Sequence, residues 1–373
     1  MIKTQRLVAL DVYRGLTIIL MIIVNTPGTW AHVWPPLDHS PWNGCTPTDL
    51  VFPSFLFIVG VAMWFSFRKF DHKLNRPALM KILRRTLLIF LIGLLINFLF
   101  VLNLKNLRIP GVLQRIALAY GMAAILVTLL DRKWRWITAA FILLAYWGIL
   151  MLFGGEHPLE LLTNVVRRID LSLLGPNHVW HGFPLDSPNK IPFDPEGILS
   201  TFPAIVNVIL GYQVGELIGT SSNHAQVSRR LLIFGVAGVI LGLIWNMVLP
   251  INKPIWTSSY VVYTTGIGTL ILALFLWVID VKGWQKWTNP FRVYGMNPLF
   301  VYVLADLWVI LLFAVRLPLH GEKLDGYAWL YNAVFVPLSG NNAFSSFLFG
   351  LAHVCLFWIV AEILYRKRIF IKI

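Results

Sequence analysis

The amino-acid sequence predicts an all-α, polytopic membrane protein with about ten transmembrane helices. Hydrophobic residues make up 57% of the 373 residues and charged residues only 13%, and the mean hydropathy is +0.71. A soluble domain of this size is far less apolar. Apolar runs of about 18–25 residues recur along the whole chain, and a helix needs this length to cross about 30 Å of hydrocarbon.

Ten spans can be drawn from these runs. They cover residues 7–27, 48–67, 84–104, 110–130, 135–153, 198–219, 230–250, 257–279, 291–315 and 342–364. Asp11 and Arg14 interrupt the first run and no small-residue cleavage site follows it, so we expect a retained span and not a signal peptide. Neither a repeat nor a low-complexity linker divides the sequence, so we expect one integral-membrane domain over residues 1–373.

The basic residues predict how the spans are oriented. An even number of spans places both termini on one side of the bilayer, and most of the 31 Lys and Arg residues fall in segments on that side. These residues are Lys3, Arg6 and Arg14; Arg68, Lys69, Lys73, Arg76, Lys81, Arg84 and Arg85; Arg132, Lys133 and Arg135; Arg229 and Arg230; Lys282, Lys286 and Arg292; and Arg366, Lys367, Arg368 and Lys372. Loops rich in Lys and Arg remain in the cytoplasm, so both termini are expected there. The net charge of +14 then follows from topology, and we expect no nucleic-acid partner.

Two polar segments are consequently expected on the outer side, at about residues 28–47 and 154–197. The longer one contains His157, His178 and His181 among Pro, Gly and Asn residues. It is too polar to span, and we expect it to fold over the outer face as a lid or as short helices. Because no tight ligand spacing occurs beyond the pair His178 and His181, no metal site is expected.

Candidate chemistry concentrates around the first outer segment. Asn25 ends the first span, His39 and Asn43 lie in the loop, and Asp49 begins the second span. Polar groups at the mouth of a bilayer cost free energy unless they are satisfied or used. An imidazole beside an amide donor fits acyl transfer, with His39 as general base or transient acyl carrier and Asn25 as a donor to the oxyanion. A solvated surface histidine is the alternative interpretation of His39.

Further polar residues lie inside or at the ends of the predicted spans. Gln114 and Arg115 lie about one turn into the fourth span, where Arg115 should face the bundle interior and brace a carboxylate or bind an anionic group. Glu196 stands at the start of the sixth span, where two roles are open: an acid stabilised by the helix dipole, or the partner of Arg115. Asp49 is the other candidate partner of Arg115. Asn297, in the ninth span, is expected to support the packing of the bundle.

The order of several motifs resembles a known family. The chain contains LDVYRGL, HSPWNGCTPTDLVFPSFLFIVG, IPGVLQR, DPEG, INKPIWTSSYV and YGMNPLFVYV in this order. From about Arg6 to about Ile310, these motifs resemble the membrane region of heparan-α-glucosaminide N-acetyltransferases, and most of all their bacterial relatives known as DUF5009 proteins. The animal enzymes carry a large lumenal N-terminal domain, which we expect to be missing from this chain.

The resemblance implies a transmembrane acetyltransferase in a bacterial inner membrane. Acetyl-CoA would be the co-substrate, taken from the cytosol, and the acetyl group would pass to the amine of an amino-sugar acceptor on the outer side. His39 matches the catalytic histidine of the family and Asn25 its active-site asparagine. The cytoplasmic basic residues, among them Arg14, Arg84 and Arg85, are expected to attract the phosphates of acetyl-CoA.

The supporting or substrate-binding candidates are Asp49, Asn43, Gln114, Arg115, Glu196 and Asn297. The expected partners are acetyl-CoA, the amino sugar and the lipid bilayer, and a homodimer is left open. Two other functions also stay open. One is a transporter for amino sugars or other small solutes, which would be expected to contain paired broken helices near the midplane and an inverted repeat. The other is an acyltransferase that modifies hydroxyl groups of a surface polysaccharide.

Overall fold

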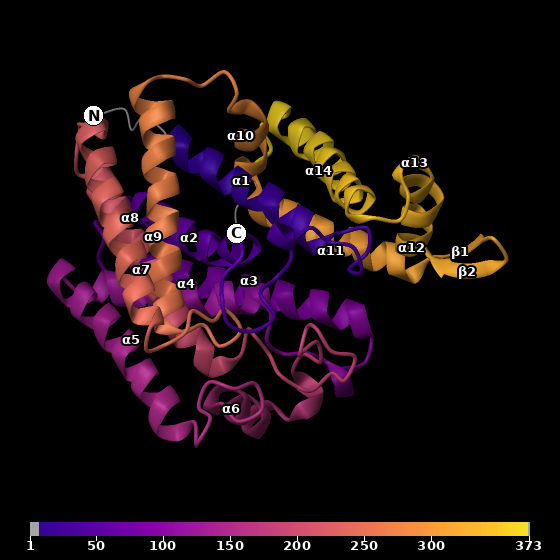
Figure 1. The fold of residues 1–373 in the computed structure, drawn as a ribbon. Helices are drawn as coiled ribbons and strands as arrows, with labels where there is room; N and C mark the ends of the chain where they lie inside the picture. The colour runs from indigo at the N-terminus through magenta and orange to yellow at the C-terminus, as the bar shows by residue number, and fades with distance from the viewer. Residues whose placement is uncertain (1–6, 372–373) are drawn as a thin grey trace. The chain divides into compact units, whose positions relative to one another are not determined.

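The structure, a computed structural model, describes residues 7–371 and consists almost entirely of helices (Figure 1). The long helices are α1 (Val8–Asn25), α2 (Val51–Phe67), α3 (Arg76–Val101), α4 (Val112–Leu129), α5 (Arg132–Phe153), α7 (Ile198–Gly219), α8 (His224–Asn246), α9 (Ser258–Phe275), α11 (Pro298–Ala314) and α14 (Ala343–Arg366). The shorter elements are α6 (Val165–Leu174), α10 (Asn289–Met296), α12 (Gly326–Leu330), α13 (Val336–Ser339) and an antiparallel hairpin of β1 (Arg316–Leu319) and β2 (Glu322–Asp325). Lys3, Arg6 and Lys372, three of the basic residues that predict the orientation of the spans, lie outside the described residues.

The predicted fold class, an all-α membrane protein, is confirmed. Within residues 7–371, nine helices are long and apolar enough to cross a membrane, and a bent pair of helices brings the number to ten if it is one span. Three of the nine, α3, α5 and α8, have only 22%, 22% and 28% of their most apolar window buried inside the protein. Their exposed Leu, Ile and Phe side chains form the kind of surface that a lipid-facing helix presents.

The ninth predicted span, residues 291–315, is divided between two helices. The chain forms α10 and α11, which are bent by 83° at a break that contains Asn297. A proline disfavours the helical conformation of the residue before it, and Asn297, which precedes Pro298, has φ −131° and ψ 50°. Its side-chain amide donates to the carbonyl of Ile369 (2.9 Å) and accepts from the N–H of Ile371 (2.8 Å). The backbone of the C-terminal segment therefore holds the break in place.

The described residues form two compact units. Unit 1 contains the residues up to His39, residues 46–51 and the residues from Val278 onward, and its main helices are α1, α10, α11 and α14. Helix α1 packs most extensively against α10. A Cβ atom at Gly15 would lie 1.7 Å from the carbonyl oxygen of Phe291, so glycine is required for this close approach of the two helices.

Unit 2 contains residues 40–45 and 52–277, and thus helices α2 to α9. Its most extensive helix contact is between α8 and α9, where a Cβ atom at Gly238 would lie 3.0 Å from the Cα atom of Gly266. Small residues allow such close packing of helices in a membrane. Helices α4 and α5 both pack against α7. That the two units act as one domain over residues 1–373 stays a prediction.

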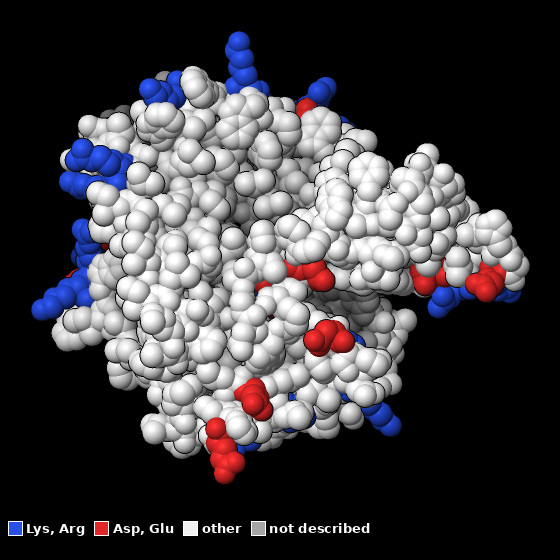
Figure 2. All heavy atoms as spheres, in the orientation of Figure 1, with Lys and Arg blue, Asp and Glu red and all other residues white. Residues whose placement is uncertain are grey.

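At one end of unit 2, the end of α2 meets the end of α7 and the start of α5. The guanidinium of Arg68 donates to the carbonyl of Gly219 (2.9 Å), and that of Arg135 donates to the carboxylate of Glu216 (3.0 Å). Figure 2 shows Lys and Arg atoms gathered near the starts of α5 and α8, whereas acidic atoms appear in this view over the region of α6. The loops of unit 2 predicted to be cytoplasmic therefore lie together.

Residues 154–197 form a compact layer of their own in unit 2. The prediction of short helices is confirmed for α6, and isolated β-bridges join His181 to Phe193 and Phe183 to Ile191. A buried cluster that includes Phe183 and Phe193 packs this layer onto Tyr146 of α5. Buried side chains and backbone hydrogen bonds therefore hold this segment against the helices of unit 2.

Candidate functional site

His39 pairs with the carboxylate of Asp49. The Nδ1 atom of His39 lies 2.6 Å from Oδ1 of Asp49, and the side chain of His39 is 28% exposed whereas that of Asp49 is 1% exposed. The second carboxylate oxygen, Oδ2, accepts hydrogen bonds from the backbone N–H (3.0 Å) and the hydroxyl (3.1 Å) of Thr46. These hydrogen bonds fix the orientation of the buried carboxylate.

The loop that carries His39 is braced by local hydrogen bonds. The backbone N–H of His39 donates to the carboxylate of Asp38 (2.8 Å), and the hydroxyl of Thr46 donates to the carbonyl of Asp38 (2.7 Å). The hydroxyl of Thr48 donates to the carbonyl of Pro36 (3.2 Å). Thr48–Leu50 form a 3₁₀ turn directly before α2, and this turn brings Asp49 under the imidazole. Both residues are candidates predicted from the sequence, but the sequence did not predict that they form a pair.

The pairing assigns a proton to one ring nitrogen of His39. An ionised carboxylate only accepts hydrogen bonds, so the Nδ1 atom of His39 carries the hydrogen that points to Asp49 when Asp49 is ionised. The neutral ring then has its lone pair on Nε2. An imidazole fixed in this tautomer by a buried carboxylate can take a proton at Nε2, or attack an acyl group there, and the carboxylate stabilises the imidazolium that forms.

Asn25, the predicted oxyanion donor, is the last residue of α1 and is exposed. It belongs to unit 1, as do His39 and Asp49. The next residue, Thr26, ends the helix with its backbone N–H and its hydroxyl both bonded to the carbonyl of Ile22. The role of the Asn25 amide in catalysis stays a prediction.

Asn43 connects the loop of His39 to the segment between α8 and α9. Its side-chain oxygen accepts a hydrogen bond from the amide of Asn252 (3.1 Å), and the backbone N–H of Gly44 donates to the carbonyl of Ile251 (2.8 Å). Gly44 has φ +109°, a conformation that favours glycine. The adjacent Trp42 donates its indole N–H to the carbonyl of Leu159 (2.9 Å). The WNG sequence is therefore a structural junction.

Of the roles left open for Glu196, direct pairing with Arg115 is not found among the described residues, because Glu196 pairs with Arg108. Nε and Nη2 of Arg108 donate to the two carboxylate oxygens of Asp194 (2.8 and 2.7 Å), and Nη2 also donates to Glu196 (2.5 Å). Burial alone would lower the pKa of the Arg108 guanidinium, but the charges and hydrogen bonds of both acids outweigh it and raise the pKa above its ordinary value. Arg108 was missed because it lies in a loop rather than in an apolar span.

Arg115 is 1% exposed and makes different contacts. Its Nη2 atom donates to the carbonyl of Gly197 (3.2 Å) and to the hydroxyl of Ser200, and its guanidinium lies 4.8 Å from the ring centre of Trp256. Its Nε and Nη1 atoms are buried without a hydrogen-bond partner in the described part of the chain. The expectation that Arg115 faces the interior of the bundle is met within unit 2.

Gln114 is also buried, and its Nε2 atom has no hydrogen-bond partner among the described residues. A Cβ atom at Gly93 would lie 2.4 Å from the side-chain oxygen of Gln114, so this amide is packed tightly against α3. Asp49, the other partner considered for Arg115, bonds to His39 and Thr46 as described above.

The remaining candidates are divided between structural and accessible positions. Asn297 uses its side chain to hold the break between α10 and α11. Arg14 donates to the carboxylate of Asp11 (3.2 Å) and to the carbonyl of Gly295 (3.0 Å), so it contributes to packing inside unit 1. Arg84 is exposed, and the guanidinium of Arg85 lies 4.6 Å from the ring centre of Tyr120. Of the three cations expected to bind acetyl-CoA, Arg84 is the most open to solvent.

Comparison with known proteins decides the family. The family described as "Heparan-alpha-glucosaminide N-acetyltransferase, catalytic" matches residues 6–230. The chain belongs to this family. Heparan-alpha-glucosaminide N-acetyltransferase from Homo sapiens is 30% identical over 426 residues, which cover 99% of this chain and 60% of the human protein. The protein of the same name from Mus musculus is 29% identical over 431 residues, covering 100% of this chain and 61% of the mouse protein. The chain thus spans about three fifths of the length of these relatives.

The predicted family of heparan-α-glucosaminide N-acetyltransferases is confirmed by these matches. The part matched by the family description includes His39 with Asp49, the Arg108 ion pairs and the outer segment, whereas Asn297 lies beyond it. The catalytic roles of His39 and Asn25 stay predictions.

Proposed function

We propose that this chain is a membrane acetyltransferase that moves an acetyl group from acetyl-CoA to the amine of glucosamine or of a glucosamine-containing saccharide. The observation that carries the proposal is the pair of His39 and Asp49, because an imidazole oriented by a carboxylate can act as the general base or the nucleophile in acyl transfer to an amine. The name of the family, an N-acetyltransferase of glucosaminides, supports the donor and acceptor chemistry.

The proposed reaction begins with removal of a proton from the sugar ammonium by Nε2 of His39. The free amine attacks the thioester carbonyl, and the amide of Asn25 donates to the oxygen on which negative charge develops. When the carbon–sulfur bond breaks, the imidazolium of His39 returns its proton to the sulfur of CoA, and the attacking nitrogen releases its second proton to water, so that the neutral amide and the CoA thiol are formed. In the alternative ping-pong sequence Nε2 takes the acetyl group first and the amine then attacks acetyl-imidazole. Single-turnover trapping with labelled acetyl-CoA in the absence of acceptor separates the two.

Substitution of His39 tests the proposed function. His39→Ala should lower the rate of acetyl transfer to glucosamine by about 10²–10⁴-fold, and Asn25→Ala by about 10²–10³-fold. His32→Ala is the matched control, because His32 lies in the same loop and is exposed. Both histidine variants should fold and insert like the wild type. If His39→Ala kept wild-type turnover while His32→Ala lost it, the proposed mechanism would be wrong.

We further propose that both termini are cytoplasmic and that the His39 loop faces outward, in the inner membrane of a bacterium. The clustering of the predicted cytoplasmic ends of α2, α5 and α7 in unit 2 supports this alternation. A reporter that is active only in the cytoplasm should work after Asp71, Arg132 and Ile373 and fail after Asn43 and Asp186. Activity at Asn43 would overturn transfer across the bilayer. Loss of activity at Ile373 alone would mean that the bent pair α10 and α11 does not cross the membrane.

A transporter is the second candidate, and the break at Asn297 favours it. Transporters of this kind contain paired broken helices, and α10 and α11 form one broken helix, without a second such break in the described residues. Transport needs no CoA, however. Stabilisation of the purified protein by acetyl-CoA against thermal unfolding would support the acetyltransferase, whereas uptake of glucosamine without binding of acetyl-CoA would support the transporter. Comparing glucosamine with a sugar that carries only hydroxyl groups separates N-acetylation from O-acetylation.

A further inference from the structure

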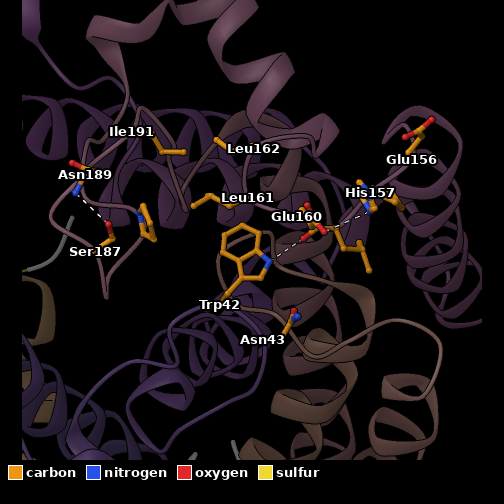
Figure 3. Close-up of a pocket in the computed structure, with 13 residues that line it drawn as sticks. Trp42, Asn43, Glu156, His157, Glu160, Leu161, Leu162, Ser187, Asn189 and Ile191 are labelled. Atoms are coloured by element: carbon orange, nitrogen blue, oxygen red, sulfur yellow. Dashed lines mark hydrogen bonds and ion pairs between the residues drawn. The ribbon is translucent and has the colours of Figure 1, made fainter.

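A pocket of about 700 Å³ lies in unit 2, a size within the range of ligand sites (Figure 3). Three segments enclose it: Trp42 with Asn43, residues 156–162, and residues 184–191. The last two belong to the outer segment, and the first belongs to the WNG junction. None of these residues has a part in the reaction proposed above.

Trp42 forms a fixed aromatic wall of this pocket. Its indole N–H donates to the carbonyl of Leu159 (2.9 Å), and the edges of Phe183 and Phe193 pack against it with ring centres 5.8 and 5.4 Å away. In Figure 3 the ring of Trp42 lies at the centre of the lining, with Leu161, Leu162 and Ile191 on one side. A rigid aromatic ring with apolar neighbours offers a flat surface to the C–H face of a sugar ring, at little cost in side-chain entropy.

Polar groups lie around this apolar wall. Asn43, Ser187 and Asn189 supply amide and hydroxyl groups, which suit the hydroxyls of a saccharide. Glu156 and Glu160 supply carboxylates, and in Figure 3 they lie to the right of Trp42, whereas Ser187 and Asn189 lie to its left. A few polar groups that converge on an apolar pocket are typical of a small-molecule site.

The lining carries acidic side chains and no Lys or Arg. His157, the remaining titratable lining residue, lies 3.5 Å from the carboxylate of Glu160. Two cations lie nearby, but backbone carbonyls hold both: Lys190 donates to those of Pro184 and Leu185, and Arg167 to those of Pro192 and Leu162. A neutral or amine-bearing sugar is therefore compatible with the lining, whereas sulfate or carboxylate groups would face Glu156 and Glu160.

Trp42 follows His39 by three residues in the sequence, and three residues of extended chain span at most about 11 Å between Cα atoms. An oligosaccharide of a few units is longer than this distance.

We infer that this pocket is a subsite that binds sugar units of the acceptor other than the reacting glucosamine, and that it takes neutral or amine-bearing units rather than sulfated or uronic ones. This inference rests on the proposed function and adds the acceptor class: oligosaccharides of glucosamine. Binding at Trp42 and the carboxylates then contributes affinity that a monosaccharide cannot gain.

The test compares glucosamine with its tetramer as acceptors. In the wild type, kcat/KM for the tetramer should exceed that for the monomer by about tenfold or more, which corresponds to about 1.4 kcal/mol of extra binding. In Glu156→Gln with Glu160→Gln this ratio should fall about threefold to tenfold, and in Trp42→Leu it should approach one. Glu322→Gln, an exposed Glu in the β1–β2 hairpin, should keep the wild-type ratio.

A binding measurement separates failure of the subsite from failure of the enzyme. Calorimetry with the fully N-acetylated tetramer should show binding that weakens in the double Glu variant, and a heparin-derived tetrasaccharide should bind at least about tenfold more weakly. If an active wild type had equal kcat/KM for the monomer and the tetramer, the subsite would be refuted, but the proposed acetyltransferase activity would not. Binding of the tetramer without acetylation of any glucosamine overturns the proposed function and supports the subsite. Tighter binding of the sulfated saccharide refutes the acceptor class.

Discussion

Asp49→Asn is the substitution that most directly tests the geometry of the site. The asparagine keeps the size of the side chain but loses the charge that lies 2.6 Å from Nδ1 of His39. The charge centres of an imidazolium and this carboxylate are about 4 Å apart, and at an effective dielectric constant of about 20 their attraction is about 4 kcal/mol. Since about 1.36 kcal/mol changes a rate tenfold, the expected loss in kcat is about 10³-fold.

The assay is acetyl transfer to glucosamine by purified protein in detergent or vesicles, with kcat and KM determined separately for both substrates. We expect the loss of rate in kcat, because the carboxylate acts on the imidazolium that forms during the reaction and not on bound substrate. Asp38→Asn is the matched control: it removes the same charge one residue from His39, and its amide oxygen can still accept the backbone N–H of His39. Equal effects of the two substitutions, or an Asp49→Asn enzyme within about threefold of wild-type kcat, would refute the assigned role.

Two further predictions concern the outer segment, and thermal unfolding of the purified protein measures both. Burial raises the pKa of Asp170 to about 7, above its value of about 3.9 in an unfolded chain, so the folded protein holds this proton more tightly. The stability that this proton contributes is fully present below about pH 4 and is lost as the pH rises through about 7. Asp170→Asn can still accept the N–H of Ile198, so its Tm should exceed that of the wild type by more at pH 8 than at pH 5. An equal increase in Tm at both pH values would contradict this. Arg108→Ala should cost about 3–5 kcal/mol because it leaves the fully buried carboxylate of Asp194 without its cation. Breaking the exposed pair of Arg316 by Arg316→Ala should cost less than about 1 kcal/mol, and similar losses for the two Arg variants would show that burial of Asp194 does not matter.

Hydropathy by itself determined the class of this protein. Apolar runs are a local property of the chain, and a bilayer tolerates few structures other than helices, so the spans could be placed from composition and length. The same local information made His39 a candidate, and the resemblance of its motif to the family matched it to the catalytic histidine, a role that stays a prediction.

Only the tertiary structure decided which charged residues meet. Arg108 and Asp194 are separated by 86 positions in the sequence. Arg108 and Arg115 lie close together in the sequence, at a separation of about two helical turns, and hydrophobic patterns do not show which of the two pairs with Asp194. The pair of His39 and Asp49 depends on the turn at Thr48–Leu50, and the break at Asn297 depends on contacts with residues near the C-terminus. A residue's type and spacing therefore limit the chemistry that it can perform, but the partner that fixes its tautomer, charge or conformation comes from chain segments that the local pattern does not contain.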